Sequence, residues 1–147
     1  MPAMILGEPT TEFLRLEVLG RAYPPTPYSC DGNTVTAHVT LAAGGFRGSF
    51  TSLFHLDDLK QFHDELRELP RVPEGTAEFS PLEEPLQFEV GCDGKGRCIV
   101  KCEAADRTIN PNRLLFELTF EQTAISGVLS QLDAIFEAFP VLRPTAG

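Results

Sequence analysis

One stretch near the end of the chain, residues 113–139, most constrains the fold, because its hydrophobic pattern changes period part-way along. In residues 113–120, apolar and polar side chains alternate as they do on a half-buried strand. From residue 125 onward, apolar side chains recur at steps of three and four, which is typical of an amphipathic helix. These helix residues are Ile125, Val128, Leu129, Leu132, Ile135, Phe136 and Phe139. A strand that runs directly into a helix, each with one apolar face, predicts a core in which the helix covers a sheet.

Residues 34–69 show the same order of elements. Residues 34–42 and 46–54 alternate on either side of Gly44 and Gly45, which predicts an antiparallel hairpin. A second predicted helix follows over residues 57–69, where an apolar stripe includes Phe62 and Pro70 marks the end. The repeated order of hairpin, aromatic strand and helix predicts that both helices leave the sheet in the same manner and cover the same face.

Four further segments complete the predicted sheet. They are residues 12–20, residues 77–79, and a hairpin formed by residues 86–92 and 98–104 around a five-residue loop. The sequence therefore predicts an α+β fold, in which a curved antiparallel β-sheet of about six or seven strands is covered by two α-helices. It also predicts an N-terminal leader over residues 1–11, a single α+β domain over 12–140 and a C-terminal tail over 141–147.

The balance of charge limits the partners that the protein can have. The chain has 12 basic and 21 acidic residues, which give a formal net charge of −9. An acidic surface repels phosphate backbones, so we expect no nucleic acid partner, whereas a basic protein would be attracted. Residues 1–12 lack the basic region of a signal peptide, and no apolar run approaches the roughly 18 residues of a membrane span. We therefore expect a cytoplasmic protein without a membrane partner.

Three of the four cysteines lie on the predicted hairpin of residues 86–104. Cys92, Cys98 and Cys102 occupy positions whose side chains point to the packed face, and their spacing does not match that of zinc-binding pairs. The hairpin would place Cys92 and Cys98 opposite one another, close enough for a disulfide, but a cytoplasmic chain keeps its thiols reduced. We predict that all three are reduced, metal-free and packed as small hydrophobic residues.

The remaining candidates for chemistry form no recognisable catalytic site. His55 and His63 are eight residues apart, not the four that would place two ligands on one helical face, and His38 points outward from a strand. His63 adjoins the apolar stripe of the first predicted helix, and we interpret it as a boundary residue rather than a general base. The sequence contains no nucleophile elbow and no phosphate-binding glycine loop. It therefore predicts a protein that is not an enzyme and that carries no cofactor.

Two groups of residues are candidates for partner binding. The proline-rich loop that begins at residue 23 offers tyrosines beside an acid, and tyrosines are frequent in binding hot spots. The first predicted helix offers a second, acidic surface. The candidate partner-binding residues are Tyr23, Tyr28, Asp31, Asp57, Asp58, Asp64 and Glu65. The alternatives are that both tyrosines only pin the loop to the sheet edge, and that Asp57 and Asp58 only favour the helix dipole.

Several segments resemble the WapI-type immunity proteins. They are Leu16-Glu-Val-Leu-Gly-Arg-Ala-Tyr-Pro24, Leu53-Phe-His-Leu-Asp-Asp-Leu59, residues 79–90, and residues 116–120 with Gln131, Leu132, Phe139 and Pro140. The resemblance covers the whole domain. It implies a non-enzymatic protein that binds and neutralises a cognate toxin domain of a large secreted bacterial toxin, with a tRNA-cleaving nuclease among the candidates. No catalytic residues carry over, because the family acts by binding. The rival hypothesis is a small-ligand binding module with a cavity between sheet and helices.

Overall fold

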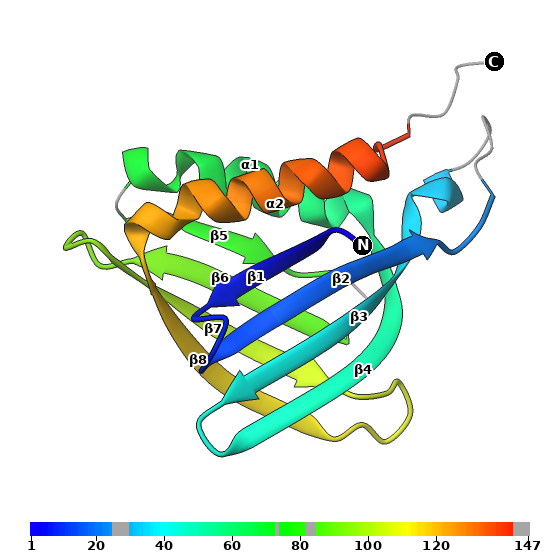
Figure 1. The fold of residues 1–147 in the computed structure, drawn as a ribbon, viewed down its shortest axis with the longest axis horizontal. Helices are drawn as coiled ribbons and strands as arrows, with labels where there is room; N and C mark the ends of the chain where they lie inside the picture. Colours follow the sequence, from blue (N-terminus) through cyan, green and yellow to red (C-terminus); the bar gives the residue numbers. More distant parts are fainter. Residues whose placement is uncertain (25–29, 73, 82–84, 143–147) are drawn as a thin grey trace.

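Two antiparallel sheets face one another, and two helices lie side by side over one end of them (Figure 1). The structure, a computed structural model, describes residues 1–24, 30–72, 74–81 and 85–142, with the backbone alone at residues 30 and 31. Each sheet has four strands, which are arranged in chain order. Neither helix is long and apolar enough to cross a bilayer within the described ranges.

The chain forms four strands and a helix, then four strands and a helix again. The first sheet contains β1 (Ala3–Gly7), β2 (Phe13–Arg21), β3 (Thr34–Ala43) and β4 (Phe46–His55), and α1 (Leu56–Glu68) follows. The second contains β5 (Thr76–Phe79), β6 (Leu86–Cys92), β7 (Arg97–Ala105) and β8 (Arg113–Glu121), and α2 (Ile125–Ala138) follows. Three short 3-10 turns are η1 (Cys30–Asn33), η2 (Leu69–Arg71) and η3 (Gln122–Ala124). The predicted strand-to-helix junctions are confirmed, because β4 runs directly into α1 and β8 runs through η3 into α2.

Each helix packs on the first strand of the other repeat. Helix α1 contacts β5, and α2 contacts β1. These strands are sheet edges, so part of their backbone would otherwise lack partners. Gln131 Oε1 on α2 accepts a hydrogen bond from the Ile5 N–H at 2.9 Å, and Glu65 Oε1 on α1 accepts one from the Glu78 N–H at 2.8 Å. The two helices therefore join the sheets and cap one edge of each.

The predicted single sheet of six or seven strands is wrong. The described residues form eight strands in two sheets, and the chain passes from the first to the second through α1 and η2. Alternating side chains indicate that a segment is a strand with one buried face, but they do not indicate which strand lies beside it. The sequence pattern therefore predicted β2 to β8, but neither β1 nor the division of the strands between two sheets.

The predicted leader over residues 1–11 is also wrong for most of its length. Strand β1 lies within it and pairs with β2 over five residues, from Ala3↔Glu17 to Gly7↔Phe13. Met4 and Leu6 are fully buried. Two inward-facing apolar residues are too short a pattern to mark a strand from sequence, and β1 depends on the neighbouring β2 and α2 for its partners.

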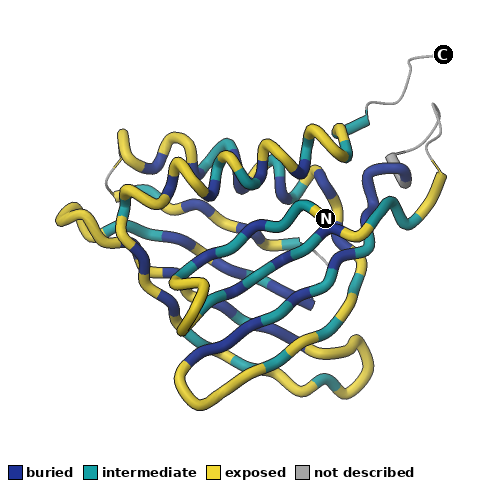
Figure 2. The backbone as a smooth tube through the Cα atoms, in the orientation of Figure 1, coloured by how far each residue is buried: buried dark blue, intermediate teal, exposed yellow. Residues whose placement is uncertain are grey.

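The facing sides of the sheets and the inner sides of both helices form one continuous core (Figure 2). A chain of aromatic rings crosses it. Phe54 lies 6.0 Å from Phe79, which stacks at 5.0 Å on Phe88, whose ring meets Phe62 of α1 edge-on at 4.9 Å. These side chains occupy the space between sheets and helix where the rival hypothesis placed a ligand cavity.

Phe136 belongs to the predicted apolar stripe of α2, but its side chain is not fully buried. The buried residues of α2 are Ile125, Val128, Leu132 and Ile135, whereas Phe136 is only partly buried. Its ring meets the His63 ring edge-on at 5.8 Å, and the Lys60 ammonium lies 5.6 Å from its centre. Phe136 therefore lies at the outer margin of the seam between the helices, because α2 turns its inner face toward β1 rather than toward α1 alone.

Cys92 and Cys98 form a disulfide between β6 and β7, so the prediction that they are reduced is wrong. They are direct partners in the strand register, as the hairpin predicted. The expectation of free thiols came from the expected cytoplasmic location, whereas the register of β6 and β7 places the two cysteines directly opposite one another, where they are bonded. Cys102 is free and buried, and burial raises the pKa of its thiol to about 12.

We expect peptide mapping to separate these cysteines into two classes. Alkylation of the unfolded protein without reductant should label Cys102 and leave Cys92 and Cys98 unlabelled. In the folded protein at neutral pH, Cys102 should also resist labelling, because a thiol with a pKa of about 12 holds almost no thiolate. Labelling of Cys92 before reduction would contradict the disulfide.

Candidate functional site

The outer surface of α1 carries a network of charged side chains, beside a hollow that we call the α1 groove. The groove lies between the second half of α1 and β5 and has a volume of about 580 Å³. Its lining residues are Lys60, Gln61, Asp64, Glu65, Glu68, Leu69, Val72, Gly75 and Thr76. It thus combines an apolar floor with three carboxylates and one ammonium group.

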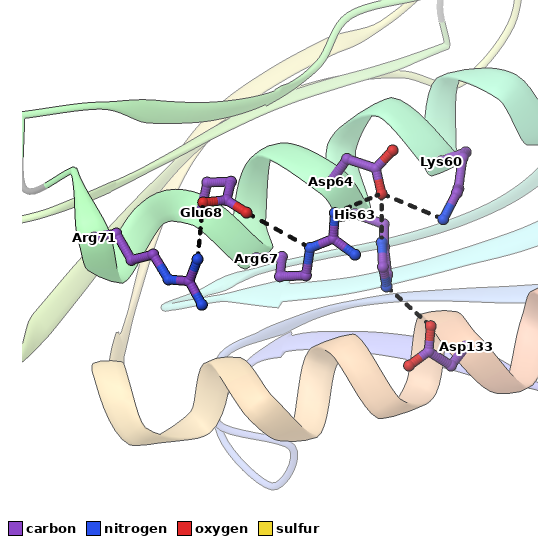
Figure 3. A network of polar contacts seen from close by, with 7 residues as sticks. All are labelled: Lys60, His63, Asp64, Arg67, Glu68, Arg71 and Asp133. Atoms are coloured by element: carbon purple, nitrogen blue, oxygen red, sulfur yellow. Dashed lines mark hydrogen bonds and ion pairs between the residues drawn. The ribbon is translucent and has the colours of Figure 1, made fainter.

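The charged side chains of α1 form a network because they lie opposite its buried stripe. Lys60 lies 3.3 Å from Asp64, and Arg67 lies 4.0 Å from Asp64 and 3.8 Å from Glu68. Arg71 extends the network to Glu68 at 3.7 Å (Figure 3). These pairs are spaced one to four residues apart on exposed side chains, so each contributes less than about 1 kcal/mol. Their main effect is to hold the charges in fixed positions.

His63 joins this network to α2. The residue is only 5% exposed. Its Nδ1 lies 3.0 Å from Asp64 Oδ1, and its Nε2 lies 2.9 Å from Asp133 Oδ1 on α2 (Figure 3). A protonated ring donates to both carboxylates, whereas a neutral ring can donate to only one. His63 adjoins the apolar stripe of α1, as the sequence predicted, but it is buried rather than at the boundary. Its link to Asp133 was missed because the sequence pattern gave no contact between the two helices.

Comparison with known proteins identifies the family of this chain. Residues 4–140 match the model of the Immunity protein WapI-like family. The chain belongs to the WapI-like immunity protein family. A solved structure of Trypanosoma brucei MRP1/MRP2 is similar with a TM-score of 0.48 and 13% sequence identity, over 95% of this chain and 88% of that one. No curated protein matches the sequence.

The matched range of this WapI-like protein includes both sheets and both helices, from within β1 to just beyond α2. The predicted family resemblance is therefore confirmed. In the described residues no group of three or more His, Cys, Asp or Glu side chains is arranged to hold a metal ion.

The structure divides the predicted partner-binding residues of this WapI-like protein into two patches. The first, which we call the η1 patch, lies where η1 meets the first turn of α1. Asn33 of η1 donates a hydrogen bond from Nδ2 to Asp57 Oδ2 at 3.4 Å, so Asp57 is next to η1. Asp58 follows in the same turn, and its partial burial and the neighbouring Asp57 raise its pKa against the opposing effect of His55. The four acids predicted to form one surface of α1 therefore lie in two places: Asp57 and Asp58 are next to η1, whereas Asp64 and Glu65 line the α1 groove.

The structure describes only part of the predicted loop group Tyr23, Tyr28 and Asp31. Tyr23 lies just after β2 and is 48% exposed. The backbone of Asp31 lies in η1, but its side chain is outside the described part of the chain, as is the whole of Tyr28. Arg21 anchors this region by donating to the carbonyl oxygens of Gly32 and Pro140 at 2.5 and 2.7 Å.

The second patch is the α1 groove, which contains Asp64 and Glu65. Glu65 is engaged within the protein, because its carboxylate accepts hydrogen bonds from the Glu78 N–H and from Gln61 Nε2. Asp64 is held by Lys60 and His63. Glu68 was missed by the sequence reasoning, although its spacing of four residues from Asp64 places it on the same helical face.

The pKa of Asp64 makes the α1 network sensitive to acid. Partial burial alone would raise this pKa, but hydrogen bonds from His63 and Lys60 outweigh that effect and hold it below its usual value. A lowered pKa in the folded state stabilises the protein above the unfolded-state pKa, and the contribution is lost as the pH falls through the folded-state pKa.

We therefore expect Asp64→Asn to lower the urea midpoint at pH 7, and the difference from wild type to shrink as the pH falls from about 5 to about 3. Glu8→Gln makes the same carboxylate-to-amide change in the exposed turn between β1 and β2, outside this network, and serves as the comparison. A difference between wild type and Asp64→Asn that stays constant over this pH range would mean that Asp64 titrates normally.

Proposed function

We propose that this WapI-like protein is a non-enzymatic immunity protein that binds and neutralises a cognate bacterial toxin domain. The observation that carries the proposal is the match of residues 4–140 to the immunity family. The match extends over almost the whole chain, so the function belongs to the complete fold rather than to a short motif.

We further propose that the toxin domain is basic and that a nuclease is the leading candidate. The support is electrostatic. The chain carries a net charge of −9, and such a charge accelerates association with a basic partner. A nuclease needs a basic surface to bind a phosphate backbone, and an acidic inhibitor can cover that surface.

The η1 patch and the α1 groove are the proposed contact surfaces. Asp57 and Asp58 offer two acids in the first turn of α1, and Tyr23 offers an exposed aromatic side chain just after β2. Tyr28 and Asp31 follow Tyr23 in the sequence. The groove offers the Glu68 and Asp64 carboxylates beside Val72, which is 53% exposed. An apolar side chain next to charges fits the aliphatic stem and cationic head of a lysine or arginine.

The test uses the toxin domain encoded beside the gene for this protein, and measures association rates over a range of salt concentrations. We expect the double variants Asp57→Lys/Asp58→Lys and Asp64→Lys/Glu68→Lys to reduce the association rate by about tenfold or more at low salt. The matched control is Glu8→Lys, which reverses an exposed charge in the turn between β1 and β2.

Two results would contradict parts of this proposal. Failure of the toxin domain to bind the wild-type protein would overturn the immunity function. If the toxin domain binds at a rate that changes neither with salt nor in the two double variants, the immunity function would stand but the electrostatic mechanism would be overturned.

A further inference from the structure

Strand β4 is a sheet edge that no segment among the described residues caps. The opposite edge of the same sheet, β1, is capped by Gln131, and β5 is capped by Glu65. Strand β8 packs against β1 and β3. By contrast, β4 is hydrogen-bonded to β3 alone within the described residues, and it forms the lower right margin of the molecule in Figure 1. In an antiparallel pair, every second residue directs its N–H and C=O away from the partner strand. These groups face outward along β4.

Arg47 is the only lysine, arginine or carboxylate side chain with which the sequence of β4 protects this edge. Natural edges are commonly guarded by lysine, proline, bulges or short length. Strand β4 is ten residues long and contains no lysine, proline or carboxylate. Its register with β3 runs without a bulge from Ala43↔Phe46 to Thr34↔His55. Strand β4 is therefore a long and regular edge strand.

A hollow beside β4 could receive side chains from an added strand. It lies between the first half of β4 and the beginning of β8 and has a volume of about 320 Å³. Leu41, Phe50 and Leu114 supply apolar surface to it, and Phe46 at its rim is 65% exposed. Gly48 also lines the hollow, and a Cβ added there would be in ordinary van der Waals contact with the Leu41 side chain at 3.6 Å.

Arg47 is one of three charged residues that line this hollow, together with Asp106 and Arg113. It is the only lysine, arginine or carboxylate residue of β4, and it lines the same hollow. It makes no hydrogen bond or ion pair with any other residue that the structure describes. A carboxylate on an added strand would therefore find an available arginine, and this pair would favour one register over others.

We infer that β4 binds an extended strand of the toxin domain, which adds to the first sheet. This inference rests on the proposed immunity function and assigns the contact to a third surface. Backbone hydrogen bonds to β4 supply affinity. Apolar side chains at alternate positions enter the hollow over Phe50 and Leu114, and an acidic side chain pairs with Arg47. A second copy of this chain is the weaker occupant, because a charge of −9 on each copy opposes association.

The first test is a proline at an outward-facing backbone position. The two-residue turn Gly44–Gly45 makes Ala43 and Phe46 a hydrogen-bonded pair, so the Ser49 N–H points away from β3. Ser49→Pro removes this donor and blocks an added strand, whereas Ser49→Thr keeps the donor. We expect Ser49→Pro to weaken toxin binding by about tenfold or more and Ser49→Thr to leave it unchanged. Arg47→Glu should weaken binding as well.

The second test needs no variant and does not depend on how well Ser49→Pro folds. Hydrogen exchange of the wild-type protein should show fast exchange at outward-facing amides of β4, and these amides should become protected in the toxin complex. A complex that leaves them exposed and tolerates Ser49→Pro would overturn the inference while the immunity function stands. Absence of any complex would overturn both. Protection that depends on protein concentration without toxin would identify a second copy as the occupant and overturn the assignment to the toxin.

Discussion

Replacing Phe62 with alanine is expected to lower the free energy of unfolding by about 3–5 kcal/mol, as for other fully buried aromatic residues. Phe62 is completely buried on α1 and meets the Phe88 ring at 4.9 Å. Its loss would open a cavity where α1, β5 and β6 meet, since the ring chain continues from Phe88 to Phe79. Urea titration of the two proteins measures the difference.

Phe136→Ala is the matched control, because it removes the same side chain from the other helix. Phe136 is only partly buried, so water can fill the space that its ring leaves. We therefore expect the free energy of unfolding to fall by about 1–2 kcal/mol. Equal losses for the two variants would mean that the seam between the helices is as well packed as the core. A loss below about 1 kcal/mol for Phe62→Ala would contradict the packing of α1 against the second sheet.

Asn33→Ala is expected to cost about 2–3 kcal/mol, because it removes a buried amide that joins distant segments. Asn33 is fully buried. Its Oδ1 accepts a hydrogen bond from the Leu142 N–H at 2.6 Å, and its Nδ2 donates to the Leu142 carbonyl oxygen at 2.8 Å. The alanine variant leaves both backbone groups of Leu142 without these partners. It should therefore also loosen the segment that follows α2.

The control for this prediction is Asn112→Ala. The Asn112 side chain donates to Asp106 Oδ2 at 2.8 Å, but both residues lie in an exposed loop where water can replace the hydrogen bond. We expect its cost to stay below about 1 kcal/mol. Hydrogen exchange of residues 139–142 would distinguish local loosening in Asn33→Ala from global unfolding. Unchanged stability of Asn33→Ala would mean that Leu142 finds other partners.

These predictions depend on contacts between segments that are far apart in the chain. Asn33 and Leu142 are separated by 109 positions, and Ile5 and Gln131 by 126. His63 and Asp133 belong to helices in different repeats. Contacts of this kind hold the two sheets and the two helices together, and they also decide which edges remain open.

The candidate site was only partly predictable. Asp57, Asp58, Asp64 and Glu65 were assigned to one helical surface, because sequence position along α1 was the only information on their neighbours. The contact between Asn33 and Asp57 groups the first turn of α1 with η1 instead. The engagement of Glu65 with Glu78 and of His63 with Asp133 required the packing of α1 on β5 and α2.

The sequence by itself determined the local elements. Alternation defined β3, β4, β6, β7 and β8, and the steps of three and four defined α1 and α2, because these periods follow from the backbone geometry of each segment. Only the tertiary structure decided the division into two sheets, the capping of β1 by α2 and of β5 by α1, and the open edge of β4. Periodicity reports which face of a segment is buried. It carries no information about which distant segment covers that face, and this choice is made by packing and hydrogen bonding across the whole chain.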